Sequence, residues 1–165
     1  MTTEAEKLLN KGLAGYTGDK TSRVERGSPP FVGKSSDFRD GLDGYYRDEW
    51  FAHRTGGGQE LAIVEGKTVT RVYGGGVVDE EYLREAGITE EEVSAKHKEF
   101  LSRAKGKTRL HDEYFDEFTE GDKRWAYEYR VLHYIKQIPQ TIGIEMMHVN
   151  SHIVFSHGFV NTTVE

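Results

Sequence analysis

Two hydrophobic periodicities divide this chain into helical and extended segments. Apolar residues recur at helical spacing near 4–14 and again near 89–104. Elsewhere β-branched and aromatic residues are dense and proline is scarce, as strands require. We therefore predict helices at 4–14, 79–85 and 89–104, and strands near 45–53, 59–64, 68–73, 109–118, 124–136, 142–149 and 152–160.

Local signals mark the starts of the predicted helices. Thr3 to Glu6 and Thr89 to Glu92 both have the Thr-x-x-Glu spacing of a capping box, in which the two side chains satisfy free backbone amides. Asp79 is expected to cap the N-terminus of the brief helix predicted at 79–85. A glycine just past residue 104 is expected to end the long helix.

The stretch 15–44 is rich in Gly, Ser, Pro and charged residues and has no strong periodicity. Roughly thirty such residues make an unusually long connection, and connections of this kind are usually functional or disordered. We predict a long loop here, held to the body of the protein by Phe31, Val32, Phe38 and Leu42.

The β-rich pattern occurs twice. Gly58-Gln59-Glu60 and Gly143-Ile144-Glu145 each open a run of Gly-x-Glu, apolar stretch, polar turn, β-branched stretch and glycine. An aromatic strand precedes each run. We predict one domain, 1–165, with an internal duplication whose copies are 45–78 and 124–160.

The order of the elements indicates the fold class. Strands that follow one another in blocks with short turns favour antiparallel pairing, and helices segregated from strands favour an α+β fold. We predict two similar antiparallel β-units of three to four strands each, linked by helices packed on one face, plus a short N-terminal helix. A pocket is expected between the two units.

Composition excludes several classes of protein. The 36% hydrophobic and 12% aromatic content in 165 residues is enough for a folded core. The formal charge of −6 argues against direct nucleic-acid binding. The absence of cysteine excludes disulfides, thiolate catalysis and Cys-ligated metals. No cofactor is expected.

Two sequence features bear on location. The acidic N-terminal residues lack the apolar region of a secretory signal. No apolar run approaches the 18 or so residues that a membrane span requires. The expected location is the cytoplasm, without a membrane partner.

Charged and aromatic residues inside the β segments are the candidate ligand-binding set. Glu60 and Glu145 hold equivalent places in the two copies, and paired carboxylates can act as acid and base. A structural role, such as binding a neighbouring Arg47 or Arg130, is the favoured interpretation. The candidate ligand-binding residues are Arg47, Trp50, Glu60, Tyr73, Tyr127 and Glu145.

Histidines suggest two further sites. If residues 149–151 form a hairpin loop, His148 and His152 face each other across the strands and could share a metal ion. If the loop is only Asn150-Ser151, the pair is out of register and the metal hypothesis fails. His97 lies on the apolar stripe of its helix, which favours a packed histidine; it could act as a base if it opens to a cleft.

Two glycine-rich segments are weak candidates for phosphate or anion binding. Residues 15–21 lack the spacing of a phosphate-binding loop, and Asp19 would repel phosphate. Gly74-Gly75-Gly76 precedes a helix and could surround an anion, but close passage and positive φ at a strand end are the favoured interpretation.

Short motifs spread over most of the chain carry a family resemblance. They are Gly15-Tyr16-Thr17-Gly18, Ser22-Arg23, Gly27-Ser28, Tyr46 to Phe51, Gly58-Gln59-Glu60, Tyr73-Gly74, Gly143-Ile144-Glu145 and His157-Gly158. Together they resemble an uncharacterised, internally repeated domain family of bacteria and archaea, some members of which follow a helix-turn-helix domain. The resemblance implies no activity, and the fused regulators hint at sensing. This chain has Val69-Thr70-Arg71-Val72-Tyr73 where the family usually has a W-x-M-x-Y pattern.

Three functions remain open. The leading hypothesis is a soluble small-molecule-binding or sensing module with a pocket between the β-units. The first alternative is an enzyme that uses Glu, His and Arg side chains in that cleft. The second is a small acidic protein that binds another protein as an inhibitor or adaptor, with a homodimer possible.

Overall fold

A computed structural model describes residues 2–16, 24–28, 33–51 and 54–164. In chain order, the elements are α1 (Glu4–Tyr16), β1 (Val24–Ser28), β2 (Gly33–Asp40), β3 (Gly44–Phe51), β4 (Thr55–Val64), β5 (Lys67–Val77), α2 (Glu80–Glu85), α3 (Glu90–Ala104), β6 (Tyr114–Glu120), β7 (Lys123–Ile135), β8 (Gln140–Val149) and β9 (His152–Val164).

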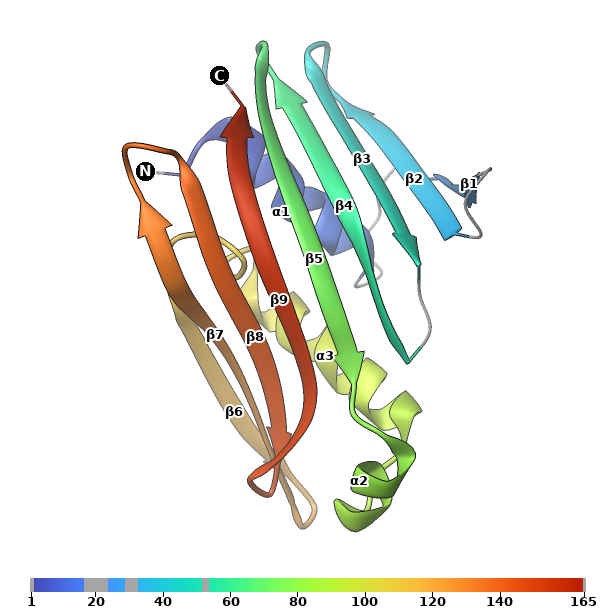
Figure 1. Cartoon of the computed structure of the whole chain (residues 1–165). Coiled ribbons are helices and arrows are strands. Elements are labelled where there is room, and N and C mark those ends of the chain that lie inside the picture. The colour runs from blue at the N-terminus through green and yellow to red at the C-terminus, as the bar shows by residue number, and fades with distance from the viewer. Residues whose placement is uncertain (1, 17–23, 29–32, 52–53, 165) are drawn as a thin grey trace.

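The strands form one antiparallel sheet in the order β1-β2-β3-β4-β5-β9-β8-β7-β6 (Figure 1). The antiparallel pairing and the α+β character are confirmed, but the prediction of two separate β-units is wrong. Strand β5 pairs with β9 from Thr68 opposite Val164 to Val77 opposite Phe155. Two separate units would each leave a long strand edge with unpaired backbone groups, and this pairing satisfies both edges.

The β5–β9 pair joins two parts of the sheet. Five strands (β1, β2, β3, β4, β5) lie on one side of this junction with α1, and four strands (β6, β7, β8, β9) lie on the other side with α3. The register places Glu60 opposite Asp48 of β3, and Glu145 opposite Tyr129 of β7. The internal duplication stays a prediction, because antiparallel runs of strands in two parts of one sheet do not establish a common origin.

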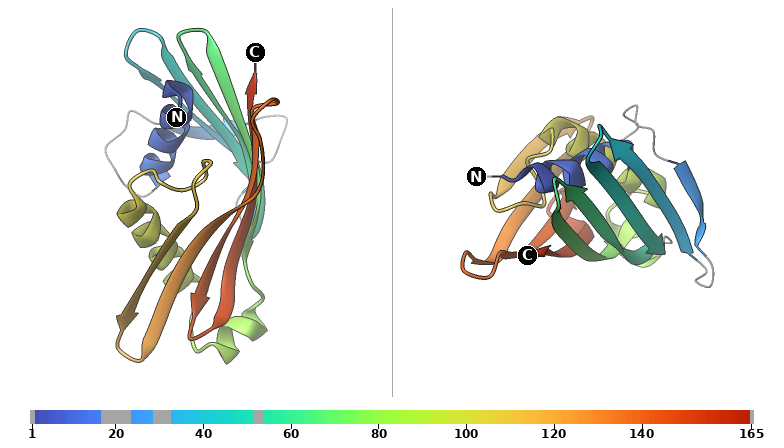
Figure 2. Two further views of the ribbon diagram at one scale, coloured as in Figure 1. Left: turned by 90° about the vertical axis from the view of Figure 1, so that its left-hand side faces the viewer. Right: turned by 90° about the horizontal axis from the view of Figure 1, so that it is seen from above.

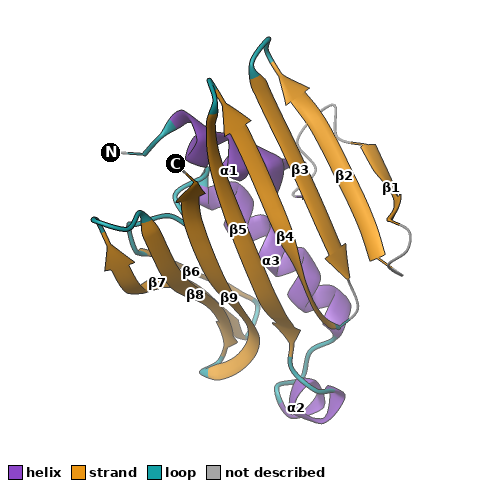
Figure 3. Cartoon of the chain, turned by 45° about the horizontal axis from the view of Figure 1, so that its top comes forward, coloured by secondary structure: helices purple, strands orange, loops and turns teal. Residues whose placement is uncertain are grey.

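Helices α1 and α3 lie on the same face of the sheet, and α2 lies at one end of it, after β5 (Figures 2 and 3). Both capping boxes are confirmed: in each, the Thr hydroxyl accepts from the Glu amide at 3.2 Å, and the Glu carboxylate accepts from the Thr amide. Asp79 precedes α2 but makes no side-chain cap. Its carboxylate instead lies 2.9 Å from Nη1 of Arg54.

The core consists of two clusters under the two helices. Leu9 of α1 packs with Tyr46 of β3 in one cluster, and Phe100 of α3 packs with Trp125 and Tyr127 of β7 in the other. Along β8 every second residue is buried, which is the period-2 pattern of a strand covered on one side. Alternation therefore directs one set of side chains toward the helices and the other set to the uncovered face.

The predicted long loop at 15–44 is wrong where the structure describes it, because β1 and β2 lie inside this stretch. Phe38 is buried and stacks on Tyr46 at 5.0 Å, whereas Leu42 is 96% exposed and anchors nothing. Residues 17–23 and 29–32, including Phe31 and Val32, lie outside the described part. The sixth strand begins at Tyr114 rather than 109, because Arg109 adopts a positive φ of 62° and breaks the extended conformation.

Within the described ranges, none of the helices combines the length and the apolar character needed to cross a lipid bilayer.

Candidate functional site

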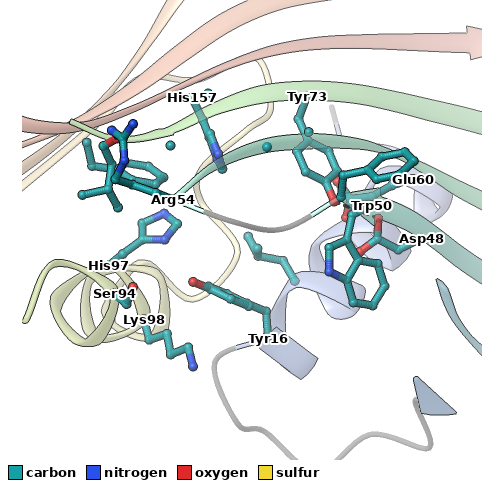
Figure 4. Close-up of a pocket in the computed structure, with 18 of the residues that line it drawn as sticks. Tyr16, Asp48, Trp50, Arg54, Glu60, Tyr73, Ser94, His97, Lys98 and His157 are labelled. Carbon is teal, nitrogen blue, oxygen red and sulfur yellow. Dashed lines mark hydrogen bonds between the residues drawn. The ribbon is translucent and has the colours of Figure 1, made fainter. Parts of the chain in front are cut away.

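A cavity of about 550 Å³ lies between the helices and the sheet (Figure 4). Helix α1 contributes Leu13 and Tyr16, and α3 contributes Ser94, His97 and Lys98. The sheet contributes the rest of the principal lining: Asp48, Trp50, Glu60, Tyr73, Phe155 and His157, with Arg109 entering from the segment before β6. The site therefore draws on both halves of the strand order.

Glu60 forms the first polar part of the floor. Its side chain is nearly completely buried, and it accepts a hydrogen bond from the Tyr46 hydroxyl at 2.9 Å and one from Nη1 of Arg71 at 3.1 Å. The buried Arg71 also donates from Nε to Asn161 at 2.9 Å and from Nη2 to Asn10 at 2.9 Å. Each nitrogen of the Arg71 guanidinium makes at least one hydrogen bond, as burial of an ion pair requires.

Glu145 forms the second polar part, beneath the cavity. Arg109 donates to its two carboxylate oxygens, from Nη2 to Oε1 at 2.6 Å and from Nε to Oε2 at 3.2 Å. The Tyr127 hydroxyl donates to Oε2 at 2.6 Å. Nε2 of His97 lies 3.2 Å from Oε1, and Nδ1 of His157 lies 3.4 Å from the same oxygen. The latter contact is close enough for an ion pair but does not meet hydrogen-bond geometry.

The electrostatics keep Glu145 ionised. Burial alone would raise its pKa, but Arg109, His97 and His157 outweigh burial and hold the pKa well below its ordinary value. Burial would lower the pKa of Arg109, and Glu145 raises it above its usual range instead. For His97 burial dominates over the attraction of Glu145, so its pKa is lowered and the ring is neutral at pH 7.

The two polar clusters are joined. The backbone carbonyl of Arg109 accepts from Nη2 of Arg71 at 3.1 Å and from Nδ2 of Asn161 at 2.6 Å. The Arg109 guanidinium also stacks 4.3 Å from the ring centre of Phe159. A continuous network of buried charges therefore runs under the cavity from β4 to β8.

Tyr73 closes the side of the cavity near β3. Its hydroxyl donates to Asp48 at 3.0 Å, and burial together with the negative charge of Asp48 raises its pKa far above the ordinary value. Its ring lies 6.0 Å from that of His157. Figure 4 shows Trp50 on this side and His97 with Ser94 and Lys98 on the opposite, helical side. The cavity thus combines aromatic walls with hydrogen-bonding groups.

The structure divides the predicted ligand-binding residues into three groups. Trp50, Glu60 and Tyr73 line the cavity. Tyr127 and Glu145 lie beneath it. Arg47 lies on the opposite face of the sheet, where it pairs with Glu49 at 2.5 Å. The strand period of two explains this difference, because Arg47 alternates with the inward-facing residues on either side of it.

The geometry required by the predicted metal pair is absent. The turn is Asn150-Ser151, both with positive φ, and a register shift follows Met147. His148 therefore lies opposite Ile153 and contacts Glu128 at 3.2 Å, while His152 lies opposite Val149. In the described ranges no group of three or more His, Asp and Glu side chains is arranged to hold a metal ion.

Several cavity residues were not in the predicted set. His97 was recognisable as a possible base, and the structure does open it to a cavity. His157 follows the same inward alternation as Phe155 and Phe159, which a correct strand register would have revealed. Asp48 and Tyr16 carried no sequence signal, because only the sheet and α1 together place them beside the same space.

The glycine-rich segment at the end of β5 also borders the cavity. Gly75 and Gly76 have φ of 140° and 150°, which confirms the predicted positive φ. A Cβ at Gly75 would lie 2.0 Å from the backbone oxygen of Ser156. Gly75 therefore allows β5 and β9 to approach closely where the cavity forms, and Gly76 allows close approach to Arg54 and Thr55 on the other side of β5.

Comparison with known proteins gives no relative from which to transfer a function: no family model, no curated protein and no solved structure matches this chain.

Proposed function

We propose that this protein binds a small molecule in the cavity between the sheet and helices α1 and α3. The observation that carries the proposal is the cavity itself, about 550 Å³ in volume and floored by buried, ionised side chains. This volume is in the range of ligand sites, which are typically about 300–1,000 Å³. The proposed position differs from the predicted seam between two β-units, since the sheet is continuous.

The buried charges support a role beyond packing. Replacing a buried ion pair by apolar side chains is often neutral or stabilising, so such pairs are weak contributors to stability. Here two pairs, Glu60–Arg71 and Glu145–Arg109, lie next to a space large enough for a ligand. The pKa values of Glu145 and Arg109 are shifted by their environment, and shifted groups in a concave site are typical of functional sites.

A thermal-shift screen of metabolites tests the proposal. A ligand that binds only the folded state at about 100 times its Kd adds about 2.7 kcal/mol to the free energy of unfolding. For a chain of this length, that corresponds to a rise in Tm of about 5–10 °C. Failure of every compound class to raise Tm would count against the proposal. The protein-binding function and the homodimer stay predictions.

A further inference from the structure

We propose that His157 is a general base in this cavity, oriented by Glu145, and that it takes a proton from the bound molecule. The inference rests on the proposed function, because it requires a molecule in the cavity. It goes further by assigning a chemical role to one side chain and a class to the ligand.

The position of Glu145 favours one tautomer of His157. The negative charge of an ionised carboxylate attracts the ring proton to the nitrogen that faces it, even at an ion-pair distance that does not meet hydrogen-bond geometry. That nitrogen is Nδ1, at 3.4 Å from Oε1. In the neutral ring the other nitrogen, Nε2, then has a free lone pair. Within the described residues Nε2 makes no hydrogen bond, and the imidazole lines the cavity (Figure 4).

The same carboxylate orients a second imidazole. His97 presents Nε2 to Oε1 of Glu145 at 3.2 Å, and its ring centre is 6.2 Å from that of His157. The side chain of His97 is only 3% exposed, and burial lowers its pKa and opposes a positive charge. The side chain of His157 is 17% exposed, so solvent and ligand reach it more readily. Of the two rings, His157 is therefore the one suited to accept a proton.

Glu145 is held rigidly for this task. Arg109 binds both of its oxygens and Tyr127 donates to Oε2, while the two imidazoles lie beside Oε1, which also accepts from Nη2 of Arg109. A proton that arrives at Nε2 of His157 produces an imidazolium beside a fixed, ionised oxygen. A carboxylate that orients a histidine and stabilises its protonated form is the arrangement used for general-base catalysis.

The cavity walls indicate the class of substrate. Tyr73 and Phe155 lie with ring centres 6.0 and 4.6 Å from that of His157, so the cavity wall beside the base is aromatic and suits contact with a planar molecule. Lys98 lines the same cavity and would favour the anion that remains after proton loss. The geometry therefore fits a planar compound with a weakly acidic C–H or O–H group.

A generic probe tests the base without knowledge of the natural substrate. In 5-nitrobenzisoxazole a base takes the C–H proton, its electron pair forms the nitrile, and the N–O bond breaks to give a phenolate. The proton goes to Nε2 and then to water, so no co-reactant is needed. We expect the wild-type protein to accelerate this elimination at least about tenfold over equimolar imidazole, since a positioned base typically contributes about 10²–10⁴-fold.

Variants identify the base. His157→Gln is expected to lower the rate to that of free imidazole or below. His148→Gln removes a partly exposed histidine on the other face of the sheet and should leave the rate unchanged. An equal rate in wild type and His157→Gln would overturn the inference. Quenching of tryptophan fluorescence, with Trp50 at the cavity, reports binding of the probe separately.

Nitrogen-15 NMR of the histidine rings provides a second readout that needs no ligand. At pH 8 we expect the proton of neutral His157 on Nδ1, and a proton on Nε2 would overturn the inference. If the probe binds but reacts no faster than with imidazole, the general base is refuted while ligand binding stands. If the probe does not bind, the position of the proton decides the question by itself.

Discussion

Replacing Arg109 by methionine tests whether the network under the cavity is built as described. Arg109 makes two hydrogen bonds to Glu145, at 2.6 and 3.2 Å, and both side chains are almost completely buried. Methionine has a similar length and keeps an apolar contact with Phe159. The substitution therefore removes the charge and its hydrogen bonds while leaving most of the volume filled.

The expected loss follows from the isolated carboxylate. Removing one partner of a buried ion pair costs about 3–5 kcal/mol, because the other charge stays buried without compensation. His97, at 3.2 Å from Oε1, can offset part of this loss by taking a proton, so we expect about 3 kcal/mol at pH 7.5. That is a large fraction of the about 5–15 kcal/mol that stabilises a typical domain.

Urea unfolding, followed by tryptophan fluorescence, measures this loss. Trp125 is fully buried and reports on the core. Arg124→Met is the matched control: Arg124 pairs with Glu117 at 2.5 Å but is largely exposed, so its loss should be under about 1 kcal/mol. The double variant Arg109→Met with Glu145→Gln should recover part of the stability. A loss under about 1 kcal/mol for Arg109→Met would refute the reasoning.

Three further predictions concern stability. The pKa values of His97 and Glu145 are lowered in the folded state, so the unfolded chain binds more protons at acidic pH. The free energy of unfolding should therefore fall as pH drops below about 6.5, where His97 titrates in the unfolded chain, and again below about 4.5, where Glu145 does. The slope is at most about 1.4 kcal/mol per pH unit for each group. Urea titrations from pH 8 to 4 that show no such decline would contradict this. Tyr46→Phe and Tyr127→Phe each remove a hydroxyl that donates to a buried carboxylate. Each substitution should lower the free energy of unfolding by about 1–3 kcal/mol. A change near zero would mean that the hydroxyls are not bonded as described. Thr89→Ala should cost about 1 kcal/mol through loss of the α3 capping box, measurable as a lower Tm, while a Thr89→Ser variant that is equally unstable would argue against capping.

Local patterns predicted the elements well. Both Thr-x-x-Glu sequences start helices, and the apolar stripe of α3 is buried, because capping and helical periodicity act within a few residues. Strands β3, β4, β5, β7, β8 and β9 were also expected close to where they lie. The first two strands were missed, because Gly, Ser and charged residues on an outer strand give little hydrophobic alternation.

The arrangement of the elements in space was harder to predict from the sequence than the elements themselves. The hydrophobic pattern of β5 and β9 does not predict that these two strands pair with each other, so two β-units were expected where the structure has one sheet. A one-residue difference in the turn after Val149 changed which histidines face each other. The cavity depends on α1 and α3, which cover different strands of one sheet, lying on the same face and bordering the same space, which is a consequence of tertiary packing. The two glutamates were nevertheless found, because charged residues within apolar strands need partners.

The claim that the cavity under α1 and α3 is a ligand site can be tested most directly by filling it. Ser94 faces the cavity from α3, whereas Ser102 lies on the exposed side of the same helix. A compound that stabilises the wild-type protein is titrated into Ser94→Phe and Ser102→Phe, with the Kd measured by calorimetry. We predict a wild-type Kd for Ser102→Phe and a Kd at least about tenfold weaker for Ser94→Phe, equivalent to about 1.4 kcal/mol. Equal affinity in the two folded variants would contradict the proposed site.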